Sequence, residues 1–506
     1  MAEKELITKE RVASRNENFL SGPKILSKPS VDFAVSLRKS KRQEAINEKR
    51  RKVCLGLSTS DQSSLNIQPL METSITRENF QMFSECFKNP LDSFYLHNAI
   101  RVFRCFTQQR QELIFKLIMD LKIIPLIIRI IQNPMIQIMC IKEAIWSVSN
   151  MASGPSYIVS ALVNEKVDVI CKEFLSSNDM ELFEYALWGL SNIAGDNIAY
   201  RNKINNMGVI EIILEKIDSL EFMMPTILWT IRNICEGGTI LKKSTLVSLL
   251  GLLKKLIRFK KNEKITIEIL WIFSYISDGN KSQIKKLIEN KILEFIFQAS
   301  SSQNSKYAIP AIRTLGNLAC GSCDQCEILF SKGILETLYG QYEKSNIFYI
   351  KSLVLWTLAN LTEGTRSQIL IITKHPILIQ VVTALNSSDS KCRNEAVNII
   401  KIISKIGTHA SIMALINVGF IKESKEFLMN STDPKLVSSV IEITLSILKQ
   451  LEDTHTSEIV ALMNQNNYSS CLLQNIASKN TKVDNMVSEI FKHLDFEIEN
   501  HEFLFG

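Results

Sequence analysis

The chain has 506 residues, of which 46% are hydrophobic, and a net charge of +7. This length is too great for one globular core, and 18 glycines and 11 prolines are few, which disfavours an all-β fold and glycine-rich phosphate loops. Residues 1–52 hold fourteen of the 59 basic and seven of the 52 acidic residues, so the positive excess belongs to this segment. The neutral remainder argues against a body that binds nucleic acid directly.

The chain begins with a polar, charged segment over residues 1–53. It has too few apolar side chains for a core, so we expect a mostly disordered basic segment that becomes partly helical when bound. Its basic run fits a localisation signal, a nucleic-acid arm or only a solvated tail. Residues 54–75 are rich in Ser, Thr, Asn and Gln and predict a flexible linker. We expect no signal peptide and no membrane-spanning segment, because charges interrupt the apolar stretches.

From residue 76 to 496 the pattern is nearly continuous amphipathic helix, followed by a short tail over residues 497–506. A regular spacing of 41 to 43 residues separates six positions, of which Arg313 alone is not tryptophan: Trp146, Trp188, Trp229, Trp271, Arg313 and Trp356. Such a period is typical of helical repeats of the armadillo and HEAT kind. We therefore predict an all-α, right-handed superhelical solenoid of about ten repeats of three helices each.

A polar side chain follows each of these positions by four residues: Asn150, Asn192, Asn233, Tyr275, Asn317 and Asn360. Positions i and i+4 share a helix face, so the six pairs, here called the ladder, are expected to line one surface. A buried amide without partners is costly, which favours an exposed groove over a core stripe. A glycine follows three or four residues later, where we expect left-handed helix ends: Gly154, Gly195, Gly237, Gly279, Gly321 and Gly364.

The chemistry of the ladder predicts a basic peptide as its ligand. Amides can hold a peptide backbone, and indoles form slots for the stems and charges of Lys or Arg. Carboxylates that could attract such charges follow the ladder closely: Asp196, Glu236, Asp278 and Glu363. A single tryptophan in a helix is more often part of a core, and any one of these acids has an equal claim to be a solvated loop residue.

The ladder and the basic segment together resemble importin α, the armadillo-repeat adaptor of nuclear import. The segment SLRKSKRQEAINEKRRKV is similar to the part of that family that binds importin β. The motifs EAIWSVSN, WGLSNIAGD, WIFSY and RTLGN follow the family's repeats in order, and the family also has Tyr and Arg where Tyr275 and Arg313 stand. The resemblance implies an adaptor that carries cargo with basic nuclear localisation signals and shuttles between cytoplasm and nucleus.

The resemblance also implies roles for particular residues. A major site for the localisation signal would comprise Trp146, Asn150, Gly154, Trp188, Asn192, Asp196, Trp229, Asn233, Trp271, Tyr275 and Asp278, with Asp196 and the carbonyl near Gly154 anchoring the principal lysine. A minor site would comprise Arg313, Asn317, Trp356, Asn360 and Glu395. Importin β would bind Arg38, Lys39, Lys41, Arg42, Lys49, Arg50 and Arg51, of which the last three would also occupy the major site as an autoinhibitor. The C-terminal repeats would bind an export receptor of the CAS type.

Three positions depart from the family's pattern around the minor site. Asn398 and Ile402 stand where the next Trp and Asn are expected, and Leu353 replaces a glutamate that braces the arginine. The alternative is an armadillo scaffold of the β-catenin kind without a transport role. Such grooves are typically basic and take acidic partners, whereas this ladder has carboxylates beside it.

No feature of the sequence indicates catalysis, a cofactor, a metal or a small-molecule substrate. Cys320, Cys323 and Cys326 form a CxxCxxC run without a fourth ligand at a suitable spacing. The six histidines are dispersed, and no GxSxG, HExxH or phosphate-loop motif occurs. We therefore expect a protein that is not an enzyme.

Overall fold

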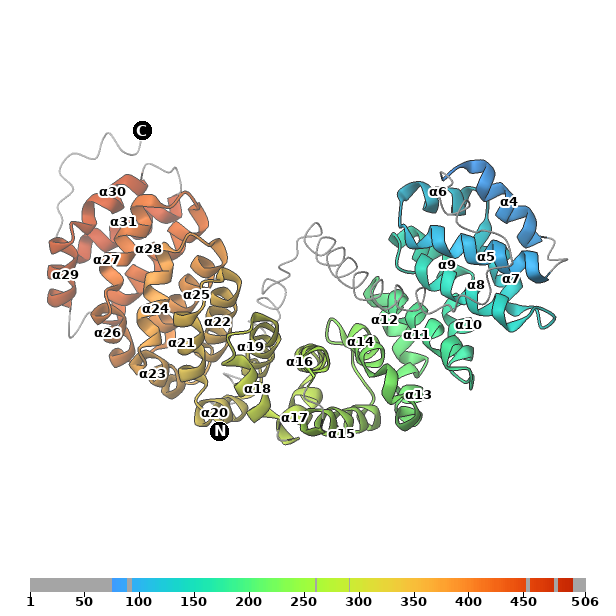
Figure 1. Ribbon diagram of the computed structural model, residues 1–506. Helices are drawn as coiled ribbons and strands as arrows, with labels where there is room; N and C mark the ends of the chain where they lie inside the picture. Colours follow the sequence, from blue (N-terminus) through green and yellow to red (C-terminus); the bar gives the residue numbers. More distant parts are fainter. Residues whose placement is uncertain are drawn as a thin grey trace. The chain divides into compact units, whose positions relative to one another are not determined.

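Every regular element is a helix in the part of the chain that the computed structural model describes, namely residues 75–88, 93–259, 262–290, 292–451, 456–476 and 481–494. The described helices, labelled in Figure 1, divide into two units after Gln283, which lies within α17 (Lys281–Glu289). The all-α prediction is confirmed.

The helices of the first unit run as follows: α4 (Arg77–Lys88), α5 (Ser93–Gln108), α6 (Glu112–Asp120), α7 (Ile123–Gln132), α8 (Ile138–Met151), α9 (Ser156–Asn164), α10 (Val167–Phe174), α11 (Met180–Ala194), α12 (Ile198–Asn206), α13 (Val209–Glu215), the 3-10 helix η1 (Ile217–Met223), α14 (Met224–Cys235), α15 (Lys243–Phe259) and α16 (Glu263–Ser277). Three complete triplets, α6 to α8, α9 to α11 and α12 to α14, form successive repeats. In the next repeat the single helix α15 takes the place of two.

The second unit continues after α17 with these helices: α18 (Leu293–Ser300), α19 (Ser305–Ala319), α20 (Cys323–Ser331), α21 (Ile334–Lys344), α22 (Phe348–Thr362), α23 (Arg366–Lys374), α24 (Ile377–Thr383), η2 (Ala384–Asn386), α25 (Ser390–Ile406), α26 (His409–Asn417), α27 (Phe420–Asn430), α28 (Pro434–Gln450), α29 (Thr456–Gln465), α30 (Tyr468–Ile476) and α31 (Thr481–His493). With α4 and α5 as an incomplete first repeat, the described helices make ten repeats, as predicted.

The third helices of successive repeats pack against one another within each unit (Figure 1). In the first unit α5, α8, α11, α14 and α16 are neighbours in that order, and in the second unit α19, α22, α25, α28 and α31 are. Each repeat buries its apolar face against the next, as expected for a solenoid. The third helices therefore present corresponding faces side by side.

Side chains of Asp or Asn fix where many third helices begin. Asp179 accepts hydrogen bonds from the backbone N–H groups of Glu181 and Leu182 at the start of α11, and Asp389 does the same at the start of α25. Asn262 caps α16 in the same way. Such caps satisfy amide groups that have no partner within the helix, so these residues set where the third helices begin.

The glycines after the third helices do not have the expected left-handed backbone, except Gly237 with φ +72°. The left-handed residues lie instead between first and second helices, where the φ values are 79°, 77° and 98° at Gly208, Gly333 and Gly419. Gly154 is needed for space, since an added Cβ would lie 2.7 Å from the ring of Phe115. The expectation failed because a helix end can select glycine for close packing as well as for positive φ.

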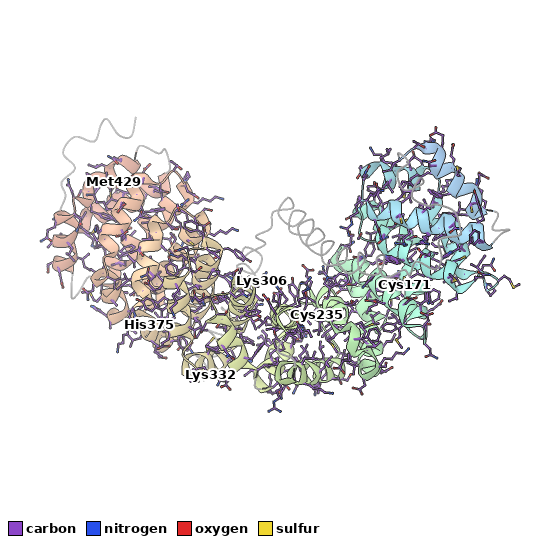
Figure 2. The ribbon with its side chains drawn as sticks, in the orientation of Figure 1. Cys171, Cys235, Lys306, Lys332, His375 and Met429 are labelled. Atoms are coloured by element: carbon purple, nitrogen blue, oxygen red, sulfur yellow. The ribbon has the colours of Figure 1, made fainter. Side chains whose placement is uncertain are left out.

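Buried thiols are part of the core between the helices. Cys171 on α10 and Cys235 on α14, labelled in Figure 2, are both free and buried. Burial raises the pKa of each thiol to about 12, because desolvation disfavours the thiolate. These cysteines therefore act as small apolar side chains in the core.

Candidate functional site

All predicted residues of the major site lie in the first unit and all those of the minor site lie in the second. The ladder pairs occupy the third helices, one pair on each of α8, α11, α14, α16, α19 and α22. The sequence periodicity thus corresponds to the third helices, which pack side by side within each unit.

The indoles of the ladder differ in how far they are covered. Trp146 is 8% exposed, whereas Trp188, Trp229, Trp271 and Trp356 are half-buried. The half-buried indoles are the ones whose surface a ligand can reach.

The ladder asparagines are mostly buried, with 6 or 7% of the residue exposed for all except the half-buried Asn360. The Nδ2 group of four of them donates to the preceding third helix: Asn150 to Thr107 Oγ1 at 3.2 Å, Asn192 to the Ser149 carbonyl at 2.8 Å, Asn233 to the Ser191 carbonyl at 3.1 Å, and Asn360 to the Gly316 carbonyl at 3.1 Å. The expectation that the amides lie in an exposed groove is therefore wrong for Asn150, Asn192 and Asn233, which are buried. At least one N–H of each of these four amides is engaged within the chain.

Asp196 follows α11 and lies beside the start of α9. Its Oδ1 accepts a hydrogen bond from the Ser156 hydroxyl at 2.8 Å, and its Oδ2 accepts one from Asn197 Nδ2 at 3.0 Å. Ser156 stands two residues after Gly154, so the carboxylate and the backbone near Gly154 lie close together. Both donors are neutral, so neither of them compensates the negative charge of Asp196.

The other acids of the first unit have different surroundings. Glu236 Oε2 lies 3.6 Å from the guanidinium of Arg201, which also donates to the Glu236 carbonyl at 3.0 Å. Asp278 ends α16 and is half-buried, whereas Tyr275 is buried. Unlike Glu236, which lies beside a guanidinium, Asp196 accepts hydrogen bonds from neutral groups, an arrangement suited to receive a cation from a ligand.

Sequence reasoning missed two side chains that cover Trp146. The guanidinium of Arg104, on α5, lies 3.9 Å from the centre of the Trp146 ring. Tyr185, on α11, stacks on Trp146 with ring centres 4.8 Å apart and an angle of 25° between the planes. Arg104 also pairs with Glu143, which lies 39 residues further along the chain. Opposite charges about one repeat apart were the available signal.

In the second unit the Trp356 indole packs against Gly316 on the neighbouring helix α19. A Cβ added to Gly316 would clash with the six-membered part of the indole. Asn360 donates to the carbonyl of the same glycine. Gly316 therefore allows α22 to place both of its ladder residues against α19.

Glu395, the predicted acid of the minor site, lies on α25 and is half-buried. Desolvation, and after it the charge of Glu363, raises the pKa of Glu395 to about 7. Asn398 is exposed, and Leu353 is buried in α22. The two positions thus contribute a solvent-facing amide and a core side chain, in place of the indole and the bracing glutamate that the family's pattern calls for.

The predicted importin-β-binding residues lie outside the described residues: Arg38, Lys39, Lys41, Arg42, Lys49, Arg50 and Arg51. The predicted segments over residues 1–53 and 497–506 and nearly all of the linker lie outside them too.

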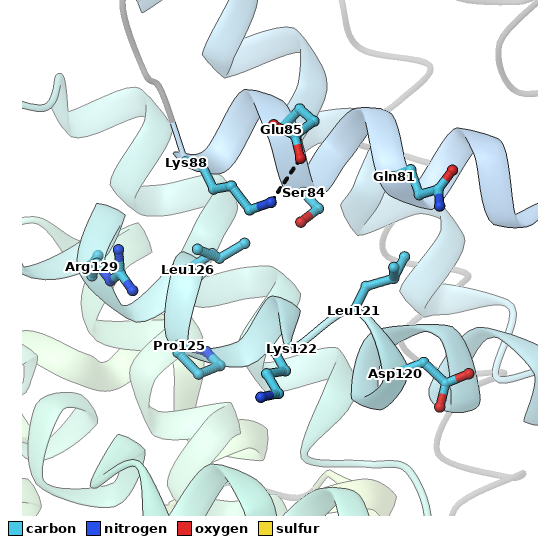
Figure 3. Close-up of a pocket in the computed structure, with 10 residues that line it drawn as sticks. All are labelled: Gln81, Ser84, Glu85, Lys88, Asp120, Leu121, Lys122, Pro125, Leu126 and Arg129. Carbon is cyan, nitrogen blue, oxygen red and sulfur yellow. Dashed lines mark hydrogen bonds and ion pairs between the residues drawn. The ribbon is translucent and has the colours of Figure 1, made fainter.

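A separate hollow of about 800 Å³ lies between α4 and α7 (Figure 3). Its lining mixes both signs of charge and contains no ladder residue: Gln81, Ser84, Glu85, Lys88, Asp120, Leu121, Lys122, Pro125, Leu126 and Arg129. Lys88 Nζ is paired with Glu85 Oε1 at 2.7 Å. The hollow offers no convergent set of polar groups for a ligand.

Two absences concern only the described part of the chain. There, no group of three or more His, Cys, Asp or Glu residues is placed to hold a metal ion. Within the same residues no single helix is long and apolar enough to cross a membrane. One bent pair of helices, α23 with α24 and η2, has the length and composition of a membrane span, by these two criteria alone.

Comparison with known proteins gives a consistent result. The chain is 26% identical over 309 residues to importin subunit alpha-1b of Oryza sativa subsp. japonica, a match that covers 61% of this chain and 58% of that protein. It is 24% identical over 342 residues to importin subunit alpha-8 of Arabidopsis thaliana, covering 67% of this chain and 75% of that protein. The match to the first relative thus spans less than two thirds of its length.

Structural comparison agrees on the fold. A crystal structure of an engineered protein aligns with 83% of this chain and 99% of its own, with a TM-score of 0.69 and 19% identity. No family model matches the chain. The chain therefore has an armadillo-repeat architecture, and its sequence is similar to those of importin α subunits.

Proposed function

We propose that this protein is a nuclear import adaptor that binds basic localisation signals of cargo proteins along the third helices of its first unit. The observation that supports this proposal most directly is the environment of Asp196. Its carboxylate is oriented by two neutral donors, Ser156 and Asn197. The ammonium group of a lysine would supply the missing positive charge and form a charge-assisted hydrogen bond.

The half-buried Trp188 lies on α11, the helix that ends two residues before Asp196, and supplies the second part of the proposed site. The aliphatic stem of a lysine can lie along an indole while its charge reaches the nearby carboxylate. Trp229 and Trp271 on the next third helices would take further basic side chains. In the second unit, Glu395 and Trp356 would form the acid and the indole of a minor site.

The N-terminal segment completes the proposed adaptor by binding importin β. Lys49, Arg50 and Arg51 would compete for the major site until importin β withdraws them, and the C-terminal repeats would bind an export receptor of the CAS type. The protein would accordingly shuttle between cytoplasm and nucleus. These roles rest on the resemblance of the sequence to the importin α family.

Affinity for a fluorescent lysine-rich localisation peptide tests the cargo site in the full-length protein. Asp196→Asn should weaken binding about 10- to 100-fold, since a hydrogen bond to a charged group contributes roughly 1.5–3 kcal/mol. Trp188→Ala should also weaken binding. Asp218→Asn, an exposed position in η1 outside the ladder, is the matched control and should bind like the wild type. Unchanged affinity in the Asp196 and Trp188 variants would contradict the proposed site.

Importin β capture tests the transport role and separates the adaptor from a β-catenin-like scaffold. Full-length protein should be captured, and protein lacking residues 1–53 should not. Capture of neither form would favour the scaffold. Alanine at Lys49, Arg50 and Arg51 should raise the affinity of the free protein for the peptide, and an equal or lower affinity would exclude autoinhibition by these residues.

A further inference from the structure

We propose that Arg104 fills the first position of the ladder, at Trp146, so that a bound basic peptide is recognised only from Trp188 onwards. This inference rests on the proposed function, because it concerns which residues of the same site meet the ligand. It makes Arg104 a residue that determines specificity by occupying, from within the chain, a slot suited to a cationic side chain of the ligand.

The geometry around Trp146 supports this occupation. Arg104 comes from the preceding third helix, α5, and Tyr185 comes from the following one, α11. The guanidinium lies 3.9 Å from the centre of the indole ring, and the phenol ring stacks at 4.8 Å. Since α8 packs between α5 and α11, the two groups approach the indole from different sides. Trp146 is consequently the most covered of the ladder tryptophans.

An ion pair holds Arg104 in this position. Its Nε lies 2.5 Å from Glu143 Oε2, and only 7% of the residue is exposed. The pair has two effects. It restricts the guanidinium to the space above Trp146, and it neutralises the carboxylate that would otherwise attract a cation of the ligand there. Asp196 differs from Glu143 because its hydrogen-bond donors, Ser156 and Asn197, are neutral and do not neutralise its charge.

A comparable pair in the same unit separates the effect of charge from the effect of occupation. Arg232, on α14, lies 3.2 Å from Glu268 Oε2 on α16. Glu268 stands three residues before Trp271, just as Glu143 stands three residues before Trp146. Trp271 nevertheless remains half-buried. Removal of Arg232 therefore removes the same charge as removal of Arg104 without uncovering Trp146.

An alanine scan of a lysine-rich peptide, with affinities measured on the full-length protein, tests the inference. With wild-type protein, replacing the peptide lysine that meets Asp196 by alanine should weaken binding. The Trp146→Ala protein should give the same affinities as the wild type for every peptide of the scan. Arg104→Leu should uncover the indole and raise the affinity for the lysine-rich peptide about 3- to 10-fold through a new cation–π contact. Alanine at one further peptide lysine should then weaken binding. Adding Trp146→Ala to Arg104→Leu should abolish this gain.

Two further variants keep the test decisive. Arg232→Leu should add no sensitivity that depends on Trp146, and an equal gain from it would overturn the inference by attributing the effect to charge alone. Tyr185→Gln uncovers the other side of the indole while leaving the Arg104–Glu143 pair in place, and it should give a smaller gain at the same lysine if Arg104→Leu fails to fold. If neither Arg104→Leu nor Tyr185→Gln makes a further peptide lysine important for binding, the inference is also overturned.

The outcomes distinguish this inference from the proposed function. If wild-type protein binds no basic peptide, or if Asp196→Asn has no effect on binding, the proposed function fails. If Asp196 matters but Arg104 and Tyr185 do not, the peptide site stands and only the inference about its first position fails.

Discussion

Asn192 donates its Nδ2 to the backbone carbonyl of Ser149, one repeat earlier, at 2.8 Å. Both residues are almost fully buried. Asn233 makes the corresponding bond to Ser191. The ladder amides therefore connect consecutive third helices, and they contribute to the stability of the solenoid whether or not a peptide is bound.

Asn192→Ala should lower the free energy of unfolding by roughly 1–3 kcal/mol, because it leaves the buried Ser149 carbonyl without this donor. Asn398→Ala is the control, since Asn398 is an exposed asparagine of a later third helix, α25, at the position that a ladder tryptophan takes in other repeats. Its effect should stay within about 0.5 kcal/mol. Urea denaturation followed by circular dichroism measures both. Equal effects in the two variants would mean that the hydrogen bond from Asn192 to the Ser149 carbonyl contributes nothing to the free energy of unfolding.

The sequence predicted the architecture well because a repeat period and a pair at i and i+4 both survive packing unchanged. Trp188 and Asn192 were placed on one helix face, and α11 bears them there. The exposure of each side chain was not predictable in this way. Whether Trp146 is open or covered depends on Arg104 and Tyr185, which come from other helices. The packing of α5 and α11 on α8 decides whether these two side chains point toward Trp146.

Charge pairs one repeat apart were the signal that the ladder argument overlooked. Lys142 pairs with Glu181, 39 residues later, and Lys401 pairs with Glu442, 41 residues later. A search for opposite charges at the repeat period would have found these pairs and the one at Arg104. The glycines failed for a different reason, since the sequence does not distinguish a glycine chosen for positive φ from one chosen for space.

Gly316→Ala should destabilise the second unit by roughly 1–3 kcal/mol, because the new methyl group overlaps the Trp356 indole. Gly340→Ala is the control within the same unit. Gly340 lies inside α21, and a Cβ there meets no atom within 4 Å, so this change should stabilise by about 0.5–1 kcal/mol. Thermal unfolding gives both values, and tryptophan emission reports any displacement of Trp356. A Gly316 variant as stable as the wild type would contradict the close packing.

Glu395→Gln should stabilise the protein at high pH and not at low pH. The pKa of Glu395 is raised from 4.5 to about 7, chiefly by desolvation and also by Glu363, so the free-energy cost of ionising this half-buried group in the folded protein is absent below pH 4.5 and complete above pH 7. At pH 8 the variant should be more stable by roughly 2–3 kcal/mol, and the difference should shrink towards zero as pH falls to 4.5. Glu426→Gln, at an exposed position of α27, should show no such trend.

The affinity of the minor site for a basic peptide should rise as Glu395 ionises, whereas the stability of the protein falls. A lysine or arginine of a peptide favours the ionised form of Glu395, so affinity for a peptide confined to this site should rise between pH 6 and pH 8. The rise should disappear in Glu395→Gln, which cannot ionise. Isothermal titration calorimetry in two buffers of different ionisation enthalpy would also detect the proton released on binding at pH 6.5. Binding without proton release, and with the same pH dependence in the variant, would mean that Glu395 does not meet the ligand's cation.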